Sequence, residues 1–236
     1  MFTIGAHAQT AIITKARAYL GSEAALDAVK TIHYTGKLTG PDPADATKQI
    51  QATVDIIYKK PDRHRLIVTF EKSVETTGLE GYEGWRRVQD IKDPNKASIT
   101  LLPVEQTKRV RANTWENVAF FRGLDARGGK VEVMGPVTHS GVLSDKIAFI
   151  HAPNIVFNRF FDQNTGKLVA TETESGSLIR EEGEISVAGI RFPKSITTVS
   201  KNAAGKTQTM TITFDQIKVN EVFPDSVFAF PSLGRK

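Results

Sequence analysis

Side chains able to carry chemistry are sparse in this chain of 236 residues. Glu182 and Glu184 lie two residues apart in a segment of β character, where alternation would put both carboxylates on one strand face. Paired carboxylates on one face could perform acid–base chemistry. A solvated strand face with a basic neighbour such as Arg180 is the commoner arrangement for such a pair. We therefore expect a protein without catalytic residues.

Other signatures of catalysis and of cofactor binding are missing from the sequence. The chain contains no cysteine, which excludes disulfides, thiolate metal ligands and thiol nucleophiles. It contains neither a Gly-x-Ser-x-Gly elbow nor a glycine-rich phosphate loop. The histidines stand singly and form no pair with metal-ligand spacing, so we expect no metal and no cofactor. They are His7, His33, His64, His139 and His151.

The charge of the chain is mildly basic. Lys and Arg number 31 against 26 Asp and Glu, which gives a net charge of +5 and a pI near 9.3. Such an excess is typical of a soluble surface and could also favour anionic lipids or acidic partners. The dense basic run at 108–111, KRVR, carries no interleaved aromatic residues, so nucleic acid is not an expected partner. No run of 18 apolar residues exists, and we expect no membrane span.

The N-terminus carries a processing signal. Ala6-His7-Ala8 before Gln9 fits the small-x-small pattern of signal-peptide cleavage, and residues 2–5 fit the end of an apolar region. We interpret residues 1–9 as the remnant of a signal peptide, the alternative being a plain disordered N-terminus. The prediction that follows is export, with a periplasmic location.

Hydrophobic periodicity places two helical regions in a chain otherwise made of strands. Residues 10–30 predict one kinked helix or two short ones, with Gly21 ending the first and Ser22 capping the second. Residues 103–124 return to helical spacing as one helix, or as two with Thr114 capping the second. Alternating segments predict strands at 31–39, 48–59, 63–71, 73–80, 84–89 and 97–101.

The second half of the chain predicts an antiparallel meander. Its landmark is the hairpin at 155–173, which turns at Asn164-Thr165-Gly166. Strands are predicted at 131–134, 142–151, 155–162, 167–174, 178–187, 190–200 and 206–219. Residues 220–234 should pack back as irregular structure. The regular spacing with short turns favours up-and-down topology in a mainly β fold.

The central strands of this meander are apolar on both faces. Ile147 and Phe149 share one face of their strand, while Ala148 and Ile150 share the other. A sheet that is apolar on both sides must be covered on both sides, or must line a cavity for a ligand on one of them. The available covers are the N-terminal helix and residues 103–124.

Three segments resemble the LolA/LolB-like superfamily of periplasmic lipoprotein carriers and outer-membrane lipoprotein-sorting proteins. They are FFDQNTGKLVATET at 160–173, GIRFPKSITTV at 189–199 and TFDQIKVNEVFPDSVFAFP at 213–231, and residues 16–38 look similar to the opening of such proteins. The resemblance implies a mainly β fold with a few α-helices, in which helices cover a strongly curved antiparallel sheet, a half-open barrel. It also implies a single domain at 10–236 with a helical insert at about 103–124.

The resemblance implies a non-catalytic periplasmic carrier that shelters an acyl chain of a lipoprotein or lipid in an apolar cavity. Sequence alone does not decide which strand face points inward. The side chains expected to line the cavity are Tyr58, Phe70, Trp85, Trp115, Phe120, Phe149 and Phe157. The alternative is an envelope protein-interaction or sensor domain that uses the same fold without a lipid ligand, with residues 108–111 as its contact.

Overall fold

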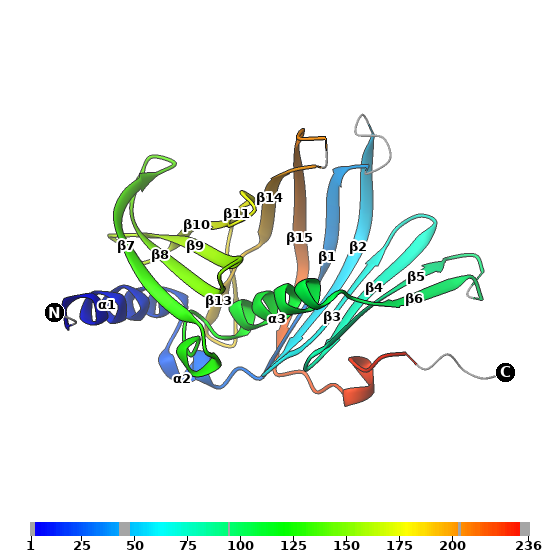
Figure 1. The fold of residues 1–236 in the computed structure, drawn as a ribbon, viewed down its shortest axis with the longest axis horizontal. Helices are drawn as coiled ribbons and strands as arrows, with labels where there is room; N and C mark the ends of the chain where they lie inside the picture. Colours follow the sequence, from blue (N-terminus) through cyan, green and yellow to red (C-terminus); the bar gives the residue numbers. More distant parts are fainter. Residues whose placement is uncertain (1–2, 43–47, 94, 203, 232–236) are drawn as a thin grey trace. The chain divides into compact units, whose positions relative to one another are not determined.

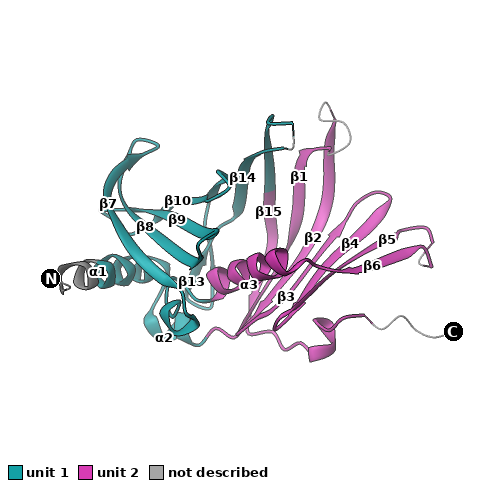
Figure 2. Cartoon of the chain, in the orientation of Figure 1, with its two compact units in different colours: residues 1–28, 119–211 teal, residues 29–118, 212–236 magenta. Residues whose placement is uncertain are grey.

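A computed structural model of the chain describes residues 3–42, 48–93, 95–202 and 204–231. The chain divides into two compact units (Figure 2). Unit 1 takes residues 1–28 and 119–211, and unit 2 takes residues 29–118 and 212–236. The expectation of a single domain at 10–236 stays a prediction.

The N-terminal region of unit 1 forms two helices, as predicted. Helix α1 spans Thr3–Leu20 and α2 spans Glu23–Asp27, and the Ser22 side chain caps α2 by accepting from the Ala25 amide at 3.2 Å. Helix α1 begins seven residues before the predicted start at residue 10. Both interpretations of residues 1–9 stay predictions. Gly21 follows α1 because a Cβ there would lie 2.6 Å from the Gly189 carbonyl oxygen.

Unit 2 opens with six strands that pair with their neighbours in chain order (Figure 1). They are β1 Thr31–Pro41, β2 Gln49–Lys59, β3 Arg63–Thr69, β4 Ser73–Glu80, β5 Glu83–Asp90 and β6 Ala97–Leu101. All five pairings are antiparallel. The predicted bounds of β4 and β6 agree with the structure to the residue. The sequence shows a turn residue next to each strand, Gly81 after β4 and Asp93 before β6.

Helix α3, Val104–Val118, is one uninterrupted helix. The predicted break and cap at Thr114 are wrong: Thr114 is buried in the helix interior, where its Oγ1 donates to the Val110 carbonyl oxygen at 2.8 Å. The helix also ends earlier than the predicted residue 124. Phe120 and Phe121 adopt left-handed backbone angles, with φ of 48° and 71°, which no α-helix can continue.

The rest of unit 1 forms the second meander and a small separate hairpin. Its strands are β7 Lys130–His139, β8 Val142–Ala152, β9 Ile155–Asp162, β10 Leu168–Thr173, β11 Leu178–Glu182, β12 Ile185–Val187, β13 Ile190–Phe192 and β14 Ser195–Lys201. The predicted strands at 178–187 and 190–200 each break in two. Gly183, with a φ of 65°, ends β11, and β12 with β13 forms a two-stranded sheet of its own.

Strand β15, Thr207–Val219, belongs to unit 1 up to Thr211 and to unit 2 from Ile212 on. The larger sheet has 13 strands in the order β6-β5-β4-β3-β2-β1-β15-β14-β11-β10-β9-β8-β7. Apart from the small hairpin, the second half therefore follows the predicted up-and-down meander. The strong curvature expected for this sheet stays a prediction.

The hairpin turn between β9 and β10 forms at the predicted residues with an unexpected stabilising group. The Asp162 carboxylate accepts from the amides of Asn164 at 2.7 Å and of Thr165 at 2.8 Å. These backbone hydrogen bonds, the one from Thr165 foremost, lower the pKa of Asp162. Gly166 supplies the left-handed φ of 78° that the turn needs.

Candidate functional site

Helix α3 covers one face of the strands in unit 2. The Asn113 side chain on α3 hydrogen-bonds the Tyr58 hydroxyl, and a Cβ added at Gly84 would lie 2.8 Å from the Thr107 Oγ1. Because Tyr58 pairs with His64, and opposite residues in an antiparallel pair share a face, His64 also lies on the α3 side. The same alternation assigns the buried Val54 and Ile56 to this face. Within unit 2, the even-numbered residues of β2 therefore lie on the α3 side, and whether this face lines a ligand cavity stays a prediction.

A neutral polar pair lies inside this face. The rings of Tyr58 and His64 stack at 4.9 Å, and both residues are buried. Burial lowers the pKa of His64 to about 4 and raises that of Tyr58 to about 12, because each charged form would lose its hydration. The Nδ1 atom of His64 has no hydrogen-bond partner. Both rings therefore remain uncharged at neutral pH.

The opposite face of these strands is covered by the C-terminal segment 220–231, here called the strap, which contains the short helix η2 Asp225–Val227. Trp85 Nε1 donates to the Phe228 carbonyl oxygen at 3.0 Å, so Trp85 lies on the strap side and away from the Tyr58 face. His33 faces Glu221 through Nδ1 at 2.6 Å and Asp55 through Nε2 at 3.2 Å. Phe228 is fully buried under this arrangement. The strap confirms for residues 220–231 that the C-terminal segment packs back onto the sheet, and residues 232–234 of the predicted segment lie outside the described residues.

A hollow of about 280 Å³ opens beside the N-terminal half of α3, where β6 ends. We call it the α3 hollow; its walls include Tyr82, Gly84, Leu101, Leu102, Val104 and Arg111. Its volume lies just below the roughly 300–1,000 Å³ that small-molecule pockets occupy. Three of its apolar side chains are strongly exposed, at 80% for Tyr82, 66% for Leu101 and 69% for Val104. Such exposure of large apolar residues at one place makes the hollow a candidate binding surface.

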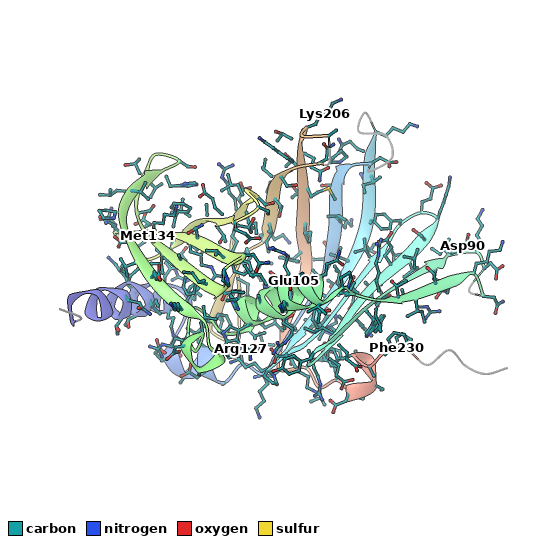
Figure 3. The ribbon with its side chains drawn as sticks, viewed as in Figure 1. Asp90, Glu105, Arg127, Met134, Lys206 and Phe230 are labelled. Atoms are coloured by element: carbon teal, nitrogen blue, oxygen red, sulfur yellow. The ribbon has the colours of Figure 1, made fainter. Side chains whose placement is uncertain are left out.

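The cation at the wall of the hollow is held in place. The Arg111 guanidinium lies 3.9 Å from the Tyr82 ring centroid and 3.1 Å from the Asp62 carboxylate. Lys108 pairs with Glu105 at 2.8 Å in the first turns of α3, where Glu105 is labelled in Figure 3. These carboxylates neutralise both cations, so the α3 hollow suits an apolar ligand better than an anion.

Unit 1 carries a second covered face, which is filled by aromatic rings. Phe149 and Phe157 are direct cross-strand neighbours, and Phe121 packs against Phe149 at 6.2 Å and Phe161 at 5.0 Å. The guanidinium of Arg159 lies 4.8 Å from the rings of both Phe121 and Phe149. All five side chains are buried. This face is a packed core.

A buried arginine ties α1 to the chain that follows residue 118. Arg17 is 1% exposed, and its guanidinium donates to both oxygens of Glu23 at 2.7–3.0 Å and to Asp27 at 2.6 Å. It also donates to the carbonyl oxygens of Phe120 at 3.0 Å and Ala119 at 3.4 Å. The hydrogen bond from Arg17 lowers the pKa of Glu23. Every direction around the guanidinium is thus occupied by an acceptor.

The predicted cavity residues fall into three environments. Tyr58 lies under α3 and Phe70, half-buried, directly follows β3; Trp115 is half-buried on α3 itself. Trp85 lies on the strap side. The others, Phe120, Phe149 and Phe157, are buried in unit 1. Their role in ligand binding stays a prediction.

Sequence reasoning missed the α3 hollow and the buried polar groups. The run Leu101-Leu102-Pro103-Val104 was a usable signal, because apolar residues directly before and in a charged helix are candidates for an uncovered surface. Nothing in the sequence marks His64 or Arg17, whose environments arise from distant residues.

The carboxylates singled out above do not lie on one strand. Gly183 interrupts the chain between Glu182 on β11 and Glu184 beyond it, and Glu184 accepts from the Tyr19 hydroxyl. Within the described ranges, no group of three or more His, Asp or Glu side chains is placed to hold a metal ion. No helix among the described residues is long and apolar enough to cross a bilayer.

Comparison with known proteins identifies the fold. No family model and no curated protein matches the sequence. Among solved structures, a LolA superfamily protein from Nitrosomonas europaea aligns over 94% of this chain and 97% of its own, at a TM-score of 0.59 and 11% identity. A DUF1329 family protein from Desulfovibrio piger aligns over 93% of this chain and 96% of its own, at a TM-score of 0.57 and 7% identity.

A third solved structure carries a functional name. It is a Vibrio parahaemolyticus domain named for outer membrane lipoprotein sorting, and it aligns over 92% of this chain and 95% of its own, at a TM-score of 0.57 and 6% identity. At sequence identities this low, the matches show a shared fold and do not show a shared activity. The matches extend over nearly the whole length of all three structures. The chain therefore has the LolA-like fold, a mainly β architecture of one large sheet with helices.

Proposed function

We propose that this protein is a non-catalytic carrier of the cell envelope that binds an acyl chain of a lipoprotein or lipid, with the α3 hollow as the entrance. The observation that carries the proposal is the hollow itself, where three large apolar side chains are exposed beside a helix that covers an apolar sheet face. The lipoprotein-sorting name of one solved structure of the same fold supports the choice of ligand.

The energetics of acyl-chain burial suit this arrangement. Each buried methylene contributes about 0.8 kcal/mol, so a long alkyl chain binds tightly without a polar anchor. A hollow of about 280 Å³ admits only one end of such a chain. The remainder reaches the Tyr58 face when α3 moves away from β2–β5. We infer that movement of α3 is the opening step of ligand uptake.

A disulfide across the cover tests both ligand and opening step. The chain has no cysteine, so the double variant Gly84→Cys/Thr107→Cys can form only one intramolecular bridge. The two positions are close enough for a disulfide, since a Cβ at Gly84 would lie 2.8 Å from the Thr107 Oγ1. A fluorescent fatty acid should bind the wild type and the reduced variant. Oxidation should weaken binding by about tenfold or more, and reduction should restore it.

Two results would count against the proposal. Failure of the wild type to take up the fatty acid, together with no acyl species in lipid extracts of protein purified from its native envelope, would refute acyl binding. Equal binding by the oxidised and reduced variants would refute the movement of α3.

Substitutions in the hollow supply a matched comparison. Val104→Asp places a charge among the exposed apolar side chains of the hollow and should weaken fatty-acid binding. Val222→Asp changes an apolar residue that is 91% exposed and lies outside the lining of the hollow. It should leave binding unchanged.

A further inference from the structure

Among the described residues, no strand pairs with the outer edge of β6. β6 is the last strand of the 13-stranded sheet on this side, with β5 as its neighbour. The Asp90 amide donates to the Lys96 carbonyl and the Leu102 amide donates to the Gly84 carbonyl, so even-numbered residues point their backbone groups at β5. The alternation of an antiparallel ladder then turns the N–H and C=O groups of Ala97, Ile99 and Leu101 outward.

This edge lacks the devices that keep sheet edges from pairing. Residues 97–101, ASITL, contain no charge, no proline and no bulge. The other terminal strand, β7, has a register shift between Val133 and Gly135, followed by Pro136, and carries Lys130 and Glu132. Bulges, prolines and charges are the usual protection of edge strands. One edge is therefore protected and the other is open to a further strand.

The side chains of β6 define what kind of strand fits. On the strap side, the alternation places Ala97 and Ile99 in line with Trp85, whose ring lies 6.5 Å from that of Phe230. Leu101, the last residue of β6, is 66% exposed and borders the α3 hollow. On the α3 side, Ser98 and Thr100 are exposed and polar. Phe230 and Asp90, the last residue of β5, are labelled in Figure 3. A matching segment alternates apolar residues on the strap side with polar residues on the α3 side.

We propose that the outer edge of β6 binds an extended segment of a partner protein, of alternating apolar and polar sequence, as an additional strand. The backbone groups of Ala97, Ile99 and Leu101 supply affinity, and the apolar strap side selects the side chains. The proline at 103 has no N–H to donate, so the docking edge ends at Leu101. The edge meets the α3 hollow at Leu101, but strand pairing requires only backbone groups, so the two kinds of binding can be measured separately.

Synthetic peptides with N-methyl groups test this edge directly. The probe is a panel of acetylated, amidated nine-residue peptides that alternate Val, Leu or Phe with Thr or Ser. Binding should protect the amides of Ala97, Ile99 and Leu101 from hydrogen exchange. N-methylation at the peptide residues whose N–H groups face β6 should abolish protection. N-methylation at the alternate residues should preserve it.

A protein variant completes the test. Ile99→Pro removes an outward donor that the β5 ladder does not use, so the sheet is retained while peptide affinity falls about tenfold. Thr100→Val alters an exposed side chain and keeps the outward backbone groups, so it should bind the peptides as the wild type does. Fatty-acid uptake should be the same in all three proteins, which separates this site from the acyl site.

Three outcomes would overturn the inference. One is that no peptide of the panel protects the three amides. Another is that both N-methylated series bind equally, which would indicate contact through side chains alone. The last is protection that grows with protein concentration without peptide, which would assign the edge to a second copy of this chain.

Discussion

Helices α1 and α3 each cover a sheet face, but the two covers are held by different chemistry. In unit 1, the fully buried Arg17 joins α1 to two carboxylates and two backbone carbonyls. In unit 2, the contacts of α3 include the half-buried pair of Arg111 with Asp62 and the hydrogen bond between the exposed Asn113 side chain and the Tyr58 hydroxyl. Partly exposed ion pairs contribute little each, and we therefore propose α3 as the cover that opens.

The covered faces of the two units also differ in how closely their side chains pack. The covered face of unit 1 is filled by rings that contact one another, with Arg159 between two of them. The covered face of unit 2 has a stacked Tyr58–His64 pair, and a hollow opens beside its helix. Close packing resists change, whereas a hollow beside a weakly held helix permits it. Unit 1 also has a hollow, of about 610 Å³ beside α1, but charged residues such as Arg122, Asp125 and Lys130 line it. We therefore propose that unit 2 is the part that receives an apolar ligand.

Truncating the packed face should have the largest effect. Phe149 is 1% exposed and touches Phe121 and Arg159, so Phe149→Ala should lower the free energy of unfolding by about 4 kcal/mol. Leu143→Ala on the same strand removes a side chain that is 53% exposed and should cost about 0.5 kcal/mol or less. Urea unfolding measures both. A loss below about 1 kcal/mol at Phe149 would contradict the close packing of unit 1.

Removing the buried arginine should rank next. Arg17→Met leaves the carbonyls of Ala119 and Phe120 without their donor, while Glu23 and Asp27 can rehydrate because they are 45% and 66% exposed. We expect a loss of about 3 kcal/mol, the lower end for a broken buried pair. Arg122→Met removes an exposed partner of the same Glu23 and should cost at most about 1 kcal/mol. Equal losses would mean that Arg17 does not lock unit 1.

The contrast between the units also explains which features the sequence revealed. Local signals were read correctly where local chemistry decides the outcome. Ser22 caps α2, Gly166 turns the β9–β10 hairpin, and β4 keeps its predicted bounds. The Thr114 prediction failed because a threonine can also bond backward to the carbonyl four residues earlier and stay within a helix.

Long-range features were invisible in the sequence. The sequence does not show on which face of the sheet Trp85 lies, because its side chain is placed by a hydrogen bond to the distant Phe228 carbonyl oxygen in the strap. Arg17 looks like any helix arginine until residues 119 and 120 approach it. The α3 hollow exists because Leu101 and Val104 remain uncovered, and a hydrophobicity pattern does not distinguish covered from uncovered apolar residues.

Acid should destabilise unit 2 through His64. Its pKa falls from an ordinary 6.5 to about 4 on folding, so the unfolded chain binds more protons between these pH values. The stabilising contribution is present above pH 6.5 and is lost as the pH falls towards 4, up to roughly 3 kcal/mol. Replacing the ring with a non-titrating one in His64→Phe should flatten this part of the pH profile. An unchanged slope in the variant would contradict the burial of a neutral histidine.

The smallest effect should fall on α3 itself. Asn113→Ala removes the hydrogen bond to Tyr58 and should cost about 1 kcal/mol, although alanine favours helix. Amides of α3 should then exchange faster and fatty acid should enter faster, while exchange in α1 stays the same. Asn117→Ala is the matched control, since its side chain bonds only within α3, to Asn113. If exchange in α1 rose as much as in α3, the two covers would open together and the distinction between them would fail.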